Sequence, residues 1–478
     1  MIDPIHPPTL PPAPAAPRRW WRDVIDAVRG VELDYTQERL SRAILLLSIP
    51  MMLEMMMESV FAVVDVFFVM RLGTAAAATV GVTEAMLTLL YALAIGLSMG
   101  TTAMVSRRIG EKRPAAAGAA AVQAIGLGIA LSVAVGFAGG LFPRQLLGLM
   151  GGTPEMLDIG AGYTRIIFAG NGTIFLLFLI NAVFRGAGDA SMAMRSLWLA
   201  NLINIVLDPC LIFGLGPFPE LGLPGAAVAT TIGRGTGVAY QLWMLLGRRS
   251  RVEIGREQLR LHAEVMLRLL RVSAFGIFQY LIATASWVVL VRIIALSAGD
   301  VALAGYTLAL RIMVFAFLPA WGMSNAVATL VGQNLGAGRP ERAERSVWMA
   351  SGYNMTFLGV VGIFFIAFPE LLIRVFTSDP DVVAAAVLCL RTVSYGWVFY
   401  ALGMVMTQAF NGAGDTVTPT IMNLFCFWLF QIPFAYSLAL LAELGPIGVY
   451  IAIAVAESLL AVVAALVFRR GRWKAQQI

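Results

Sequence analysis

Three carboxyl residues recur along one face of the first long apolar segment of the chain. Glu54, Glu58 and Asp65 are separated by steps of four and seven residues. At about 100° per residue, these steps keep all three within about 40° of one another on a helix. A carboxylate at the centre of a membrane helix costs roughly 2.5–3.5 kcal/mol, so such groups face the protein interior. The pattern predicts ion coupling or substrate contact; the alternative is structural hydrogen bonding to neighbouring helices.

A second polar constellation lies in the fifth apolar segment. Asn201, Asn204 and Asp208 follow steps of three and four residues, and Pro209 loosens the helix immediately afterwards. Carboxylate and carboxamide oxygens together suit either a shared proton or a dehydrated sodium ion. We expect Asp65, Asn204 and Asp208 to form one such site, with hydrogen bonding between helices as the alternative.

Other residues in the apolar segments are candidates for substrate contact or for movement. Pro50, one turn before Glu54, predicts a bend that either is fixed or moves during the functional cycle. The methionines beside it, Met55 among them, form either an adaptable binding wall or packing filler. We expect substrate contacts from Glu54, Asn201, Gln279, Tyr280 and Met55, with weaker candidates at Tyr306, Gln408 and Asn423. Glu84 and Glu457 either line a cavity or lie near an interface, and Arg292 and Arg311 are candidates to pair with carboxylates.

The segments that carry these residues are numerous and long enough to cross a bilayer. Hydrophobic residues make up 59% of the 478 residues and charged residues 13%, against about 25% charged in a soluble domain. Apolar stretches of about 20 residues predict an all-α polytopic membrane protein with twelve transmembrane helices. The expected spans are 43–70, 77–104, 116–141, 159–184, 196–215, 225–247, 272–296, 302–331, 346–368, 383–410, 420–441 and 447–468.

The second half of the chain repeats the first. Gly186-Ala-Gly-Asp189 recurs as Gly412-Ala-Gly-Asp415, a shift of 226 residues, and the pair Gly222 and Gly225 recurs at a shift of 223. Two repeated halves are the usual frame of a secondary transporter, with the substrate site between them. In each GAGD turn we expect glycine to end one helix and aspartate to cap the next.

The repeat divides the chain into two membrane lobes and three cytoplasmic segments. The lobes are 43–247 (helices 1–6) and 272–468 (helices 7–12). The expected cytoplasmic segments are a proline-rich tail with an interfacial segment (1–42), a basic linker (248–271) and a tail (469–478). The tail has seven prolines between Pro4 and Pro17, which favours an extended, disordered chain.

Basic residues collect in alternate loops. The cytoplasmic tails together with loops 105–114, 185–196, 248–271 and 333–345 hold 26 of the 34 Lys and Arg residues, whereas the opposite loops hold only Arg71, Arg144 and Arg374. This positive-inside pattern predicts a multi-pass membrane protein with both termini in the cytoplasm, and the family resemblance described below implies the bacterial inner membrane. The same charge pattern also explains the net charge of +6 without a nucleic-acid partner.

Sequence motifs for catalysis are missing. The chain has no GxxxxGK, HExxH or GxSxG motif, and its two histidines, His6 and His262, lie outside the predicted spans. The three cysteines form no CxxC pair, which argues against a zinc site or a disulfide framework. We therefore expect no enzyme activity, no cofactor and transport driven by an ion gradient, with H⁺ or Na⁺ as the coupling ion.

Several motifs together resemble the multidrug and toxic compound extrusion (MATE) family over essentially the whole chain after residue 40. They are Ile49-Pro50 followed by Val64-Asp65, FRGAGD at 184–189, NIVLDP at 204–209 and GAAVAT at 225–230. The resemblance implies twelve helices in two pseudo-symmetric lobes around a central cavity. It also implies export of cationic or amphipathic organic compounds in exchange for protons or sodium ions. Within the family, the chain most resembles the bacterial DinF-like branch.

The same resemblance assigns roles to individual residues. The family's acidic residue of helix 1 corresponds to Asp65, its proline to Pro50, and the helix 5 motif to Asn204 and Asp208. Thr230 matches a polar position of helix 6. Glu58, which lies on the same face of helix 1 as Asp65, is also expected to take part in ion coupling. Some branches carry a glutamate in helix 7 where this chain has Gln279, which favours an ion site in the first lobe alone.

The alternatives to organic-cation export are a flippase, an ion channel and a membrane enzyme. A flippase for lipid-linked precursors, from the same superfamily, needs a more cationic cavity to hold phosphates, whereas the intramembrane acids favour cations. An ion channel is disfavoured by the repeated lobes, and a membrane enzyme by the missing motifs. A monomer suffices, because one chain contains both lobes.

The predicted topology can be tested by labelling single cysteines with a membrane-impermeant thiol reagent in intact cells. Cysteines introduced at Gly216 and Ser297 should react from outside, and those at Lys112 and Arg339 should react only after the membrane is opened. The reverse labelling pattern would contradict the positive-inside prediction.

Overall fold

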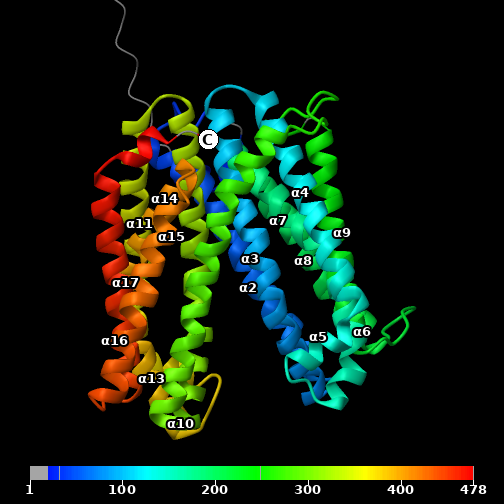
Figure 1. Cartoon of the computed structure of the whole chain (residues 1–478), viewed down its shortest axis with the longest axis vertical. Helices are drawn as coiled ribbons and strands as arrows, with labels where there is room; N and C mark the ends of the chain where they lie inside the picture. The colour runs from blue at the N-terminus through cyan, green and yellow to red at the C-terminus, as the bar shows by residue number, and fades with distance from the viewer. Residues whose placement is uncertain (1–19, 32, 248, 477) are drawn as a thin grey trace, which may run out of the picture.

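The computed structural model describes residues 20–31, 33–247, 249–476 and 478, so the proline-rich stretch at 4–17 lies outside the described residues. The described part of the chain is helical and has no strand. The N-terminal half contains α1 (Trp20–Arg29), α2 (Leu40–Met70), α3 (Thr74–Gly110), α4 (Pro114–Leu141), α5 (Pro143–Leu149), α6 (Pro154–Ala169), α7 (Gly172–Ala187), α8 (Ala190–Phe213) and α9 (Leu223–Leu246) (Figure 1). The C-terminal half contains α10 (Ala263–Gly336), α11 (Pro340–Ala367), α12 (Pro369–Ile373), α13 (Pro380–Ser394), α14 (Trp397–Ala413), α15 (Val417–Asn423), η1 (Leu424–Gln431), α16 (Ile432–Tyr436), η2 (Ser437–Leu441), α17 (Pro446–Arg469) and η3 (Arg472–Ala475).

These helices confirm the twelve predicted spans in two lobes. By length and apolarity, up to nine stretches of the described residues qualify as spans, counting the bent pair α13–α14 as one. One of them, α10, holds two spans that reverse direction at Gly299, where the backbone adopts φ 70° and ψ −159°. The remaining two spans are α2 and α9. The fourth and tenth spans are each broken in the middle, between α6 and α7 and between α13 and α14, the latter with a bend of 57°.

The two GAGD turns share their glycine geometry but not their aspartate contacts. Gly188 and Gly414 have left-handed φ values of +93° and +85° and end α7 and α14, as predicted. Asp415 accepts hydrogen bonds from the backbone N–H (3.1 Å) and hydroxyl (2.6 Å) of Thr418 in the next helix, which confirms its capping role. For Asp189 the prediction was wrong, because its carboxylate instead accepts hydrogen bonds from Ser250 (3.0 Å) and the Arg251 backbone (3.3 Å). That carboxylate ties the linker to the first lobe.

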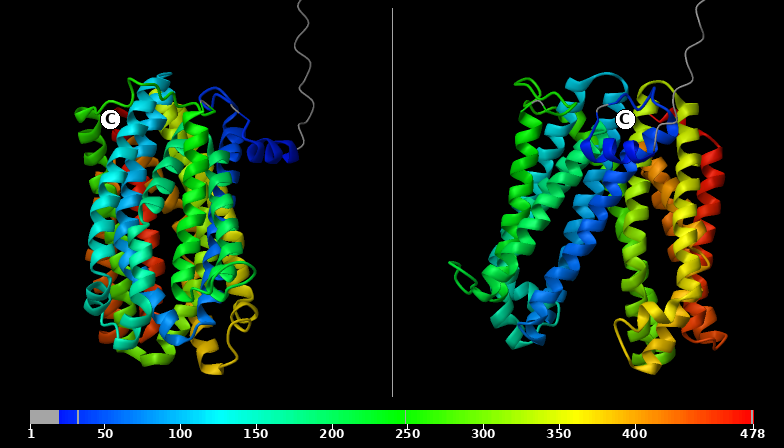
Figure 2. Two further views of the ribbon diagram at one scale, coloured as in Figure 1. Left: turned by 90° about the vertical axis from the view of Figure 1, so that its right-hand side faces the viewer. Right: turned by 180° about the vertical axis from the view of Figure 1, so that it is seen from behind.

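The last nine residues of the predicted basic linker, 263–271, are helical and belong to α10, where Arg268 and Arg271 are exposed. The linker, α1 and the C-terminus lie at the same end of the molecule as the loops after α3 and α10 (Figure 2). We call this the basic end; residues 20–29 of the predicted interfacial segment form α1, which lies across it.

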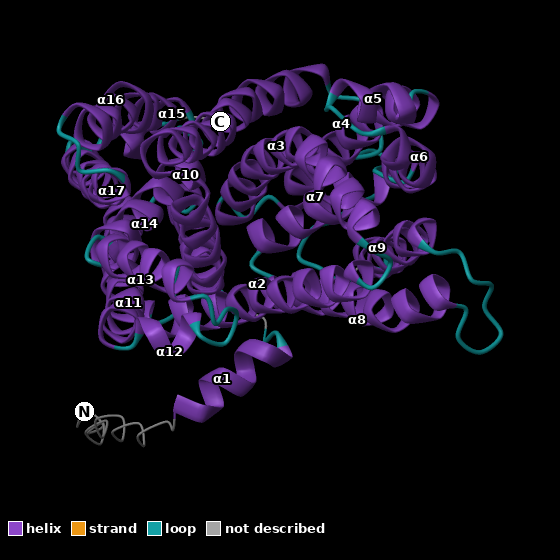
Figure 3. Ribbon diagram, turned by 90° about the horizontal axis from the view of Figure 1, so that it is seen from below, coloured by secondary structure: helices purple, strands orange, loops and turns teal. Residues whose placement is uncertain are grey.

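The two lobes meet at the basic end and separate toward the opposite end (Figures 1 and 2). At the basic end one continuous apolar core joins both lobes, with Leu47 and Met51 of α2 packed among Val327, Val331 and Phe410 of the second lobe. At the opposite end each lobe has a separate core. Seen from that end, the helices form two groups, α2–α9 and α10–α17 (Figure 3). The apolar packing therefore holds the lobes together at one end only.

Close contacts between the lobes occur in reciprocal pairs that follow the 226-residue repeat. A Cβ on Gly110 of α3 would collide with the backbone of Gln333 in α10, and a Cβ on Gly336 would collide with the backbone of Arg107. Gln333 also donates a hydrogen bond from its side chain to the Gly186 carbonyl of the first lobe (3.0 Å). Small residues allow helix backbones to approach closely within membranes. Glycine at these positions is thus required for the basic end to close.

A larger side chain at Gly336 should therefore open the basic end. We expect Gly336→Leu to drive the lobes apart there and bring them together at the opposite end. Spin labels at the exposed residues Leu149 and Val375 of the two lobes should then show a shorter mean distance. The matched control is Gly126→Leu in α4, where a Cβ would meet nothing within 4 Å. A folded Gly336→Leu protein with the wild-type distance distribution would disprove the role of this contact.

Candidate functional site

A cavity of about 270 Å³ lies between the lobes, close to where they meet. The first lobe lines it from α2, α3, α7, α8 and α9, and the second lobe from α10 and α14. Its lining residues with polar groups are Glu54, Glu58, Tyr91, Ser98, Thr102, Asn181, Arg185, Arg234, Tyr280, Trp321, Asn325, Gln408 and Asn411. The cavity occupies the position expected for a substrate site between two repeats.

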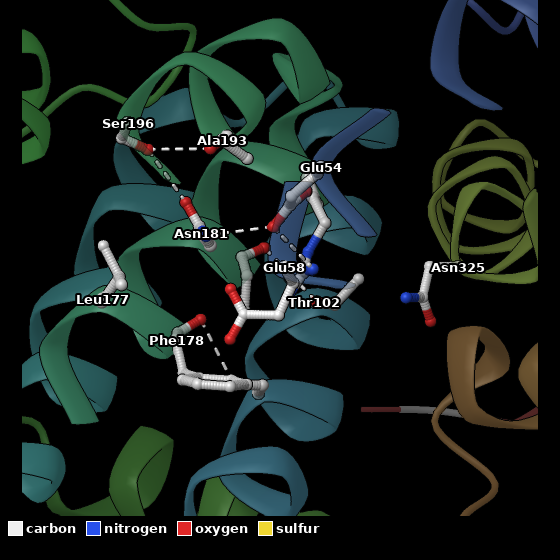
Figure 4. Close-up of polar contacts among 12 residues, drawn as sticks. Glu54, Glu58, Thr102, Leu177, Phe178, Asn181, Ala193, Ser196 and Asn325 are labelled. Carbon is white, nitrogen blue, oxygen red and sulfur yellow. Dashed lines mark hydrogen bonds and ion pairs between the residues drawn. The ribbon is translucent and has the colours of Figure 1, made fainter. Parts of the chain in front are cut away.

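Glu54 is fixed at the cavity wall by partners from α7. Its Oε1 atom accepts hydrogen bonds from Asn181 (3.1 Å) and Arg185 (3.3 Å), and the Arg185 contact is also an ion pair. Behind it, Gln241 of α9 donates a hydrogen bond to Asn181 (2.6 Å), and Ser196 of α8 hydrogen-bonds to the same oxygen (3.2 Å) (Figure 4). The network joins α2, α7, α8 and α9 and balances the charge of Glu54.

Glu58, one turn further along α2, has a different set of partners. Asn201 of α8 donates a hydrogen bond to its Oε2 atom (3.1 Å), and the guanidinium of Arg234 in α9 interacts electrostatically with its carboxylate. Arg234 also donates a hydrogen bond to the Tyr91 hydroxyl (3.3 Å) and lies 5.9 Å from the centre of the Phe61 ring. Two arginines therefore face two glutamates across the first-lobe wall.

Asn204, Asp208 and Thr230 form a second cluster in the first lobe, outside the lining of the cavity, and no described hydrogen bond or ion pair joins Asp65 to them. Asn204 donates hydrogen bonds to Thr230 (3.1 Å) and, more weakly, to Asp208 (3.5 Å), and Asp65 acts electrostatically on Asp208. The side chains of Asn204 and Asp208 are buried, and one oxygen of each, Oδ1 and Oδ2, has no hydrogen-bond partner. Unsatisfied buried oxygens next to two carboxyl groups are suited to receive a proton or a sodium ion.

The second-lobe wall carries no charge among its described lining residues. It consists of aromatic rings and carboxamides, where Gln408 donates a hydrogen bond to Asn325 (2.5 Å) and Asn411 donates one to Gln408 (2.9 Å). Asn325 stands apart from the first-lobe residues across the space between the lobes (Figure 4). Rings for stacking and amides for hydrogen bonding suit flat amphipathic compounds.

Two of the predicted substrate contacts do not line the cavity. Gln279 is buried but is not part of the lining, and its backbone oxygen accepts a hydrogen bond from Asn423 (3.5 Å). Asn201 holds Glu58 rather than lining the cavity. Glu54, Tyr280 and Met55 do line it, as does Glu58. Pro50 lies within the continuous helix α2, one residue before Met51, whose backbone packs against Gly322 of α10.

Two arginines that sequence reasoning did not assign to the cavity change its electrostatics. Arg185 was counted among the basic residues of loop 185–196, but it belongs to α7 and lines the cavity. Arg234 lies within an apolar segment, and a charged residue in such a segment indicates a functional position. Because these arginines balance Glu54 and Glu58, the acids alone do not make the cavity selective for cations.

Comparisons with known proteins agree with this geometry. The family model described as MatE matches residues 50–210 and 276–437. A probable multidrug resistance protein NorM of Thermotoga maritima is 28% identical over 439 residues, covering 90% of this chain and 93% of that protein. An FAD transporter of Shewanella oneidensis is 24% identical over 83% of this chain and 87% of its own length. A structure titled as the outward-facing conformation of a multidrug resistance MATE family transporter superposes with a TM-score of 0.87 at 28% identity, covering 94% of this chain and 98% of that one.

The pair of Arg185 and Glu54 leads to a stability prediction. The two side chains are 12% and 2% exposed, and removing one partner of a buried ion pair costs roughly 3–5 kcal/mol. Arg185→Met should therefore lower the Tm of the detergent-solubilised protein, and the added change Glu54→Gln should restore most of the loss. The control is Arg144→Met, because its pair with Asp158 is largely exposed and contributes little. Equal Tm values for the two single variants would show that the buried pair is not needed.

Proposed function

Because the chain belongs to the MatE family of multidrug and toxic compound extrusion transporters, we propose that it exports amphipathic organic compounds in exchange for protons or sodium ions. It is a membrane transporter and not an enzyme. The observation that carries the proposal is the pairing of a cavity between the lobes with a separate cluster around Asp65 and Asp208. The cavity is assigned to the organic substrate and the cluster to the ion.

The cavity supports a broad class of substrates. Its first-lobe wall has two glutamates and two arginines, and its second-lobe wall has rings and amides. Organic cations can interact with Glu54 and Glu58 and with the aromatic faces, and acidic groups of a substrate can interact with Arg185 or Arg234. The flippase alternative needs a cavity with surplus positive charge for phosphates, and here each arginine already faces a glutamate.

Ion coupling is assigned to Asp65, Asp208, Asn204 and Thr230. Two carboxyl groups that interact electrostatically release their protons as a coupled pair. Their oxygens, with those of the neighbouring amide and hydroxyl, also meet the preference of hard cations for several oxygen ligands. The arrangement therefore suits either ion. Glu58 and Asp65 both interact electrostatically with Arg234, which connects Glu58 to this site.

The expected membrane orientation indicates to which side of the membrane the space between the lobes opens. The basic end holds α1, the C-terminus and the basic loops, and the positive-inside rule assigns it to the cytoplasm of a bacterial inner membrane. The lobes separate at the opposite end, so the arrangement corresponds to a transporter open to the outside, ready to release substrate and take up an ion.

The function is tested with purified protein in proteoliposomes. A fluorescent organic cation is loaded, and a proton gradient and a sodium gradient are imposed in separate experiments. We expect one of the gradients to accelerate transport of the dye. Equal transport with and without either gradient would exclude antiport, and dye movement driven by the membrane potential alone would favour a channel.

The shared ion site predicts that its mutations are not additive. Asp65→Asn and Asp208→Asn should each lose most gradient-driven transport while leaving expression intact, and the double variant should be little worse than either. The control is Asp158→Asn, an exposed acid paired only with Arg144. Transport at the wild-type rate in Asp65→Asn, or losses that simply multiply in the double variant, would argue against one shared site.

A further inference from the structure

The second lobe contains an isolated carboxyl group that the proposed transport mechanism does not use. Glu457 of α17 is 6% exposed, and within the described part of the chain it forms neither an ion pair nor a hydrogen bond. An unpaired charge in such an environment is very costly, so the carboxyl group needs either a proton or a compensating cation.

The repeat shows that, among the described residues, an acid without a charged partner occurs at this position in the second lobe but not in the first. The shift of 223 residues that relates Gly222 to Gly445 and Gly225 to Gly448 also relates Arg234 to Glu457. In the first lobe, the arginine lies among the carboxylates of Glu58 and Asp65. In the second lobe, the equivalent position is an acid, and no described cation faces it.

Glu457 shares a small cavity with a hydrogen-bond donor that has no partner. The cavity, of about 10 Å³, is lined by Glu457, Trp397 and Tyr400, together with Trp287 and Phe317 of α10. Trp397 is 1% exposed, and its indole N–H donates to no group in the structure.

The same cavity lies beside the bend of the tenth span. Gly396 lines it between α13 and α14, where the two helices meet at 57°, and its backbone packs tightly against Ala454 of α17. The first turn of α14, which begins at Trp397, directs its free backbone N–H groups toward the bend. The partial positive charge of this helix end and the Trp397 donor can stabilise an ionised carboxylate once the side chain turns toward them.

The groups around Glu457 favour a proton over a sodium ion. The titratable groups that it acts on are the Tyr400 hydroxyl of α14 and the Cys426 thiol of η1. The residues that face the cavity from α10 and α13 are Trp287, Phe317 and Val393. A sodium ion needs several oxygen ligands, and these neighbours supply few beyond the carboxyl group itself.

We propose that Glu457 is a proton-binding site of the second lobe, separate from the Asp65 and Asp208 cluster. In the present arrangement its carboxyl group carries the proton. When the O–H bond breaks, the proton is released to solvent water, and the carboxylate is stabilised by the Trp397 N–H and the first turn of α14. The inference concerns proton binding alone and holds whatever the transported compound is.

The test compares infrared spectra of the purified full-length protein and Glu457→Gln in lipid nanodiscs over a pH series. The difference spectrum should contain the C=O stretching band of a protonated carboxyl group at low pH, and this band should disappear as pH rises. Tryptophan fluorescence of the wild-type protein should change over the same pH range. That change should be lost in Glu457→Gln and in Trp397→Phe. Glu443→Gln, which removes an exposed acid of the same lobe, is the control and should leave both signals intact.

Three results would overturn the proposal. A missing band at every pH would mean that Glu457 is ionised and paired. A band that stays constant at every pH at which the protein is folded would mean a permanently neutral structural group. A fluorescence change that follows sodium concentration at constant pH would mean that the site binds the metal ion. If Glu457→Gln fails to fold, Glu457→Asp serves instead, because it should shift the frequency of the band rather than remove it.

Discussion

The cost of a charge inside the bilayer governs how the first lobe is built. A carboxylate there costs several kcal/mol unless other groups compensate it, and α2 alone places three of them in the membrane. Their partners come from other helices: Arg185 from α7, Asn201 from α8 and Arg234 from α9. Compensation of the α2 carboxylates therefore determines which helices surround α2, and the same contacts shape one wall of the central cavity.

Helix α2 also connects the ion cluster to the contact between the lobes. Asp65 lies in the part of α2 that faces α8 and α9, whereas Met51, on the same helix, packs against Gly322 of the second lobe. The reciprocal contact is Gly96 of α3 against Ile277, and both residues are related to the first pair by the 226-residue shift. Helix α2 therefore contains both a residue of the proposed ion cluster and a residue of the interface between the lobes.

The sequence allowed the architecture to be predicted more completely than the site. Apolar length, loop charge and the repeated GAGD turns each depend on local composition, so twelve spans and two lobes could be inferred directly. Contacts between distant helices could not be inferred in the same way. Arg185 was read as a loop residue because it precedes a turn, although its side chain reaches back to Glu54 in the cavity. Asp189 was expected to cap α8 because it lies in a turn between two apolar helices, but its carboxylate contacts Ser250 and Arg251 of the linker.

The repeat therefore preserves backbone geometry while the chemistry of the two lobes diverges. Glycines at the turns and at the lobe contacts occupy equivalent positions because their function is steric, and both lobes have to pack in the same way. Charged residues have no such constraint. Arg234 and Glu457 are equivalent in position and opposite in charge, and each is compatible with its surroundings: the arginine lies among acids, and the glutamate lies among aromatic rings. The two lobes therefore combine one backbone scaffold with different charged side chains at equivalent positions.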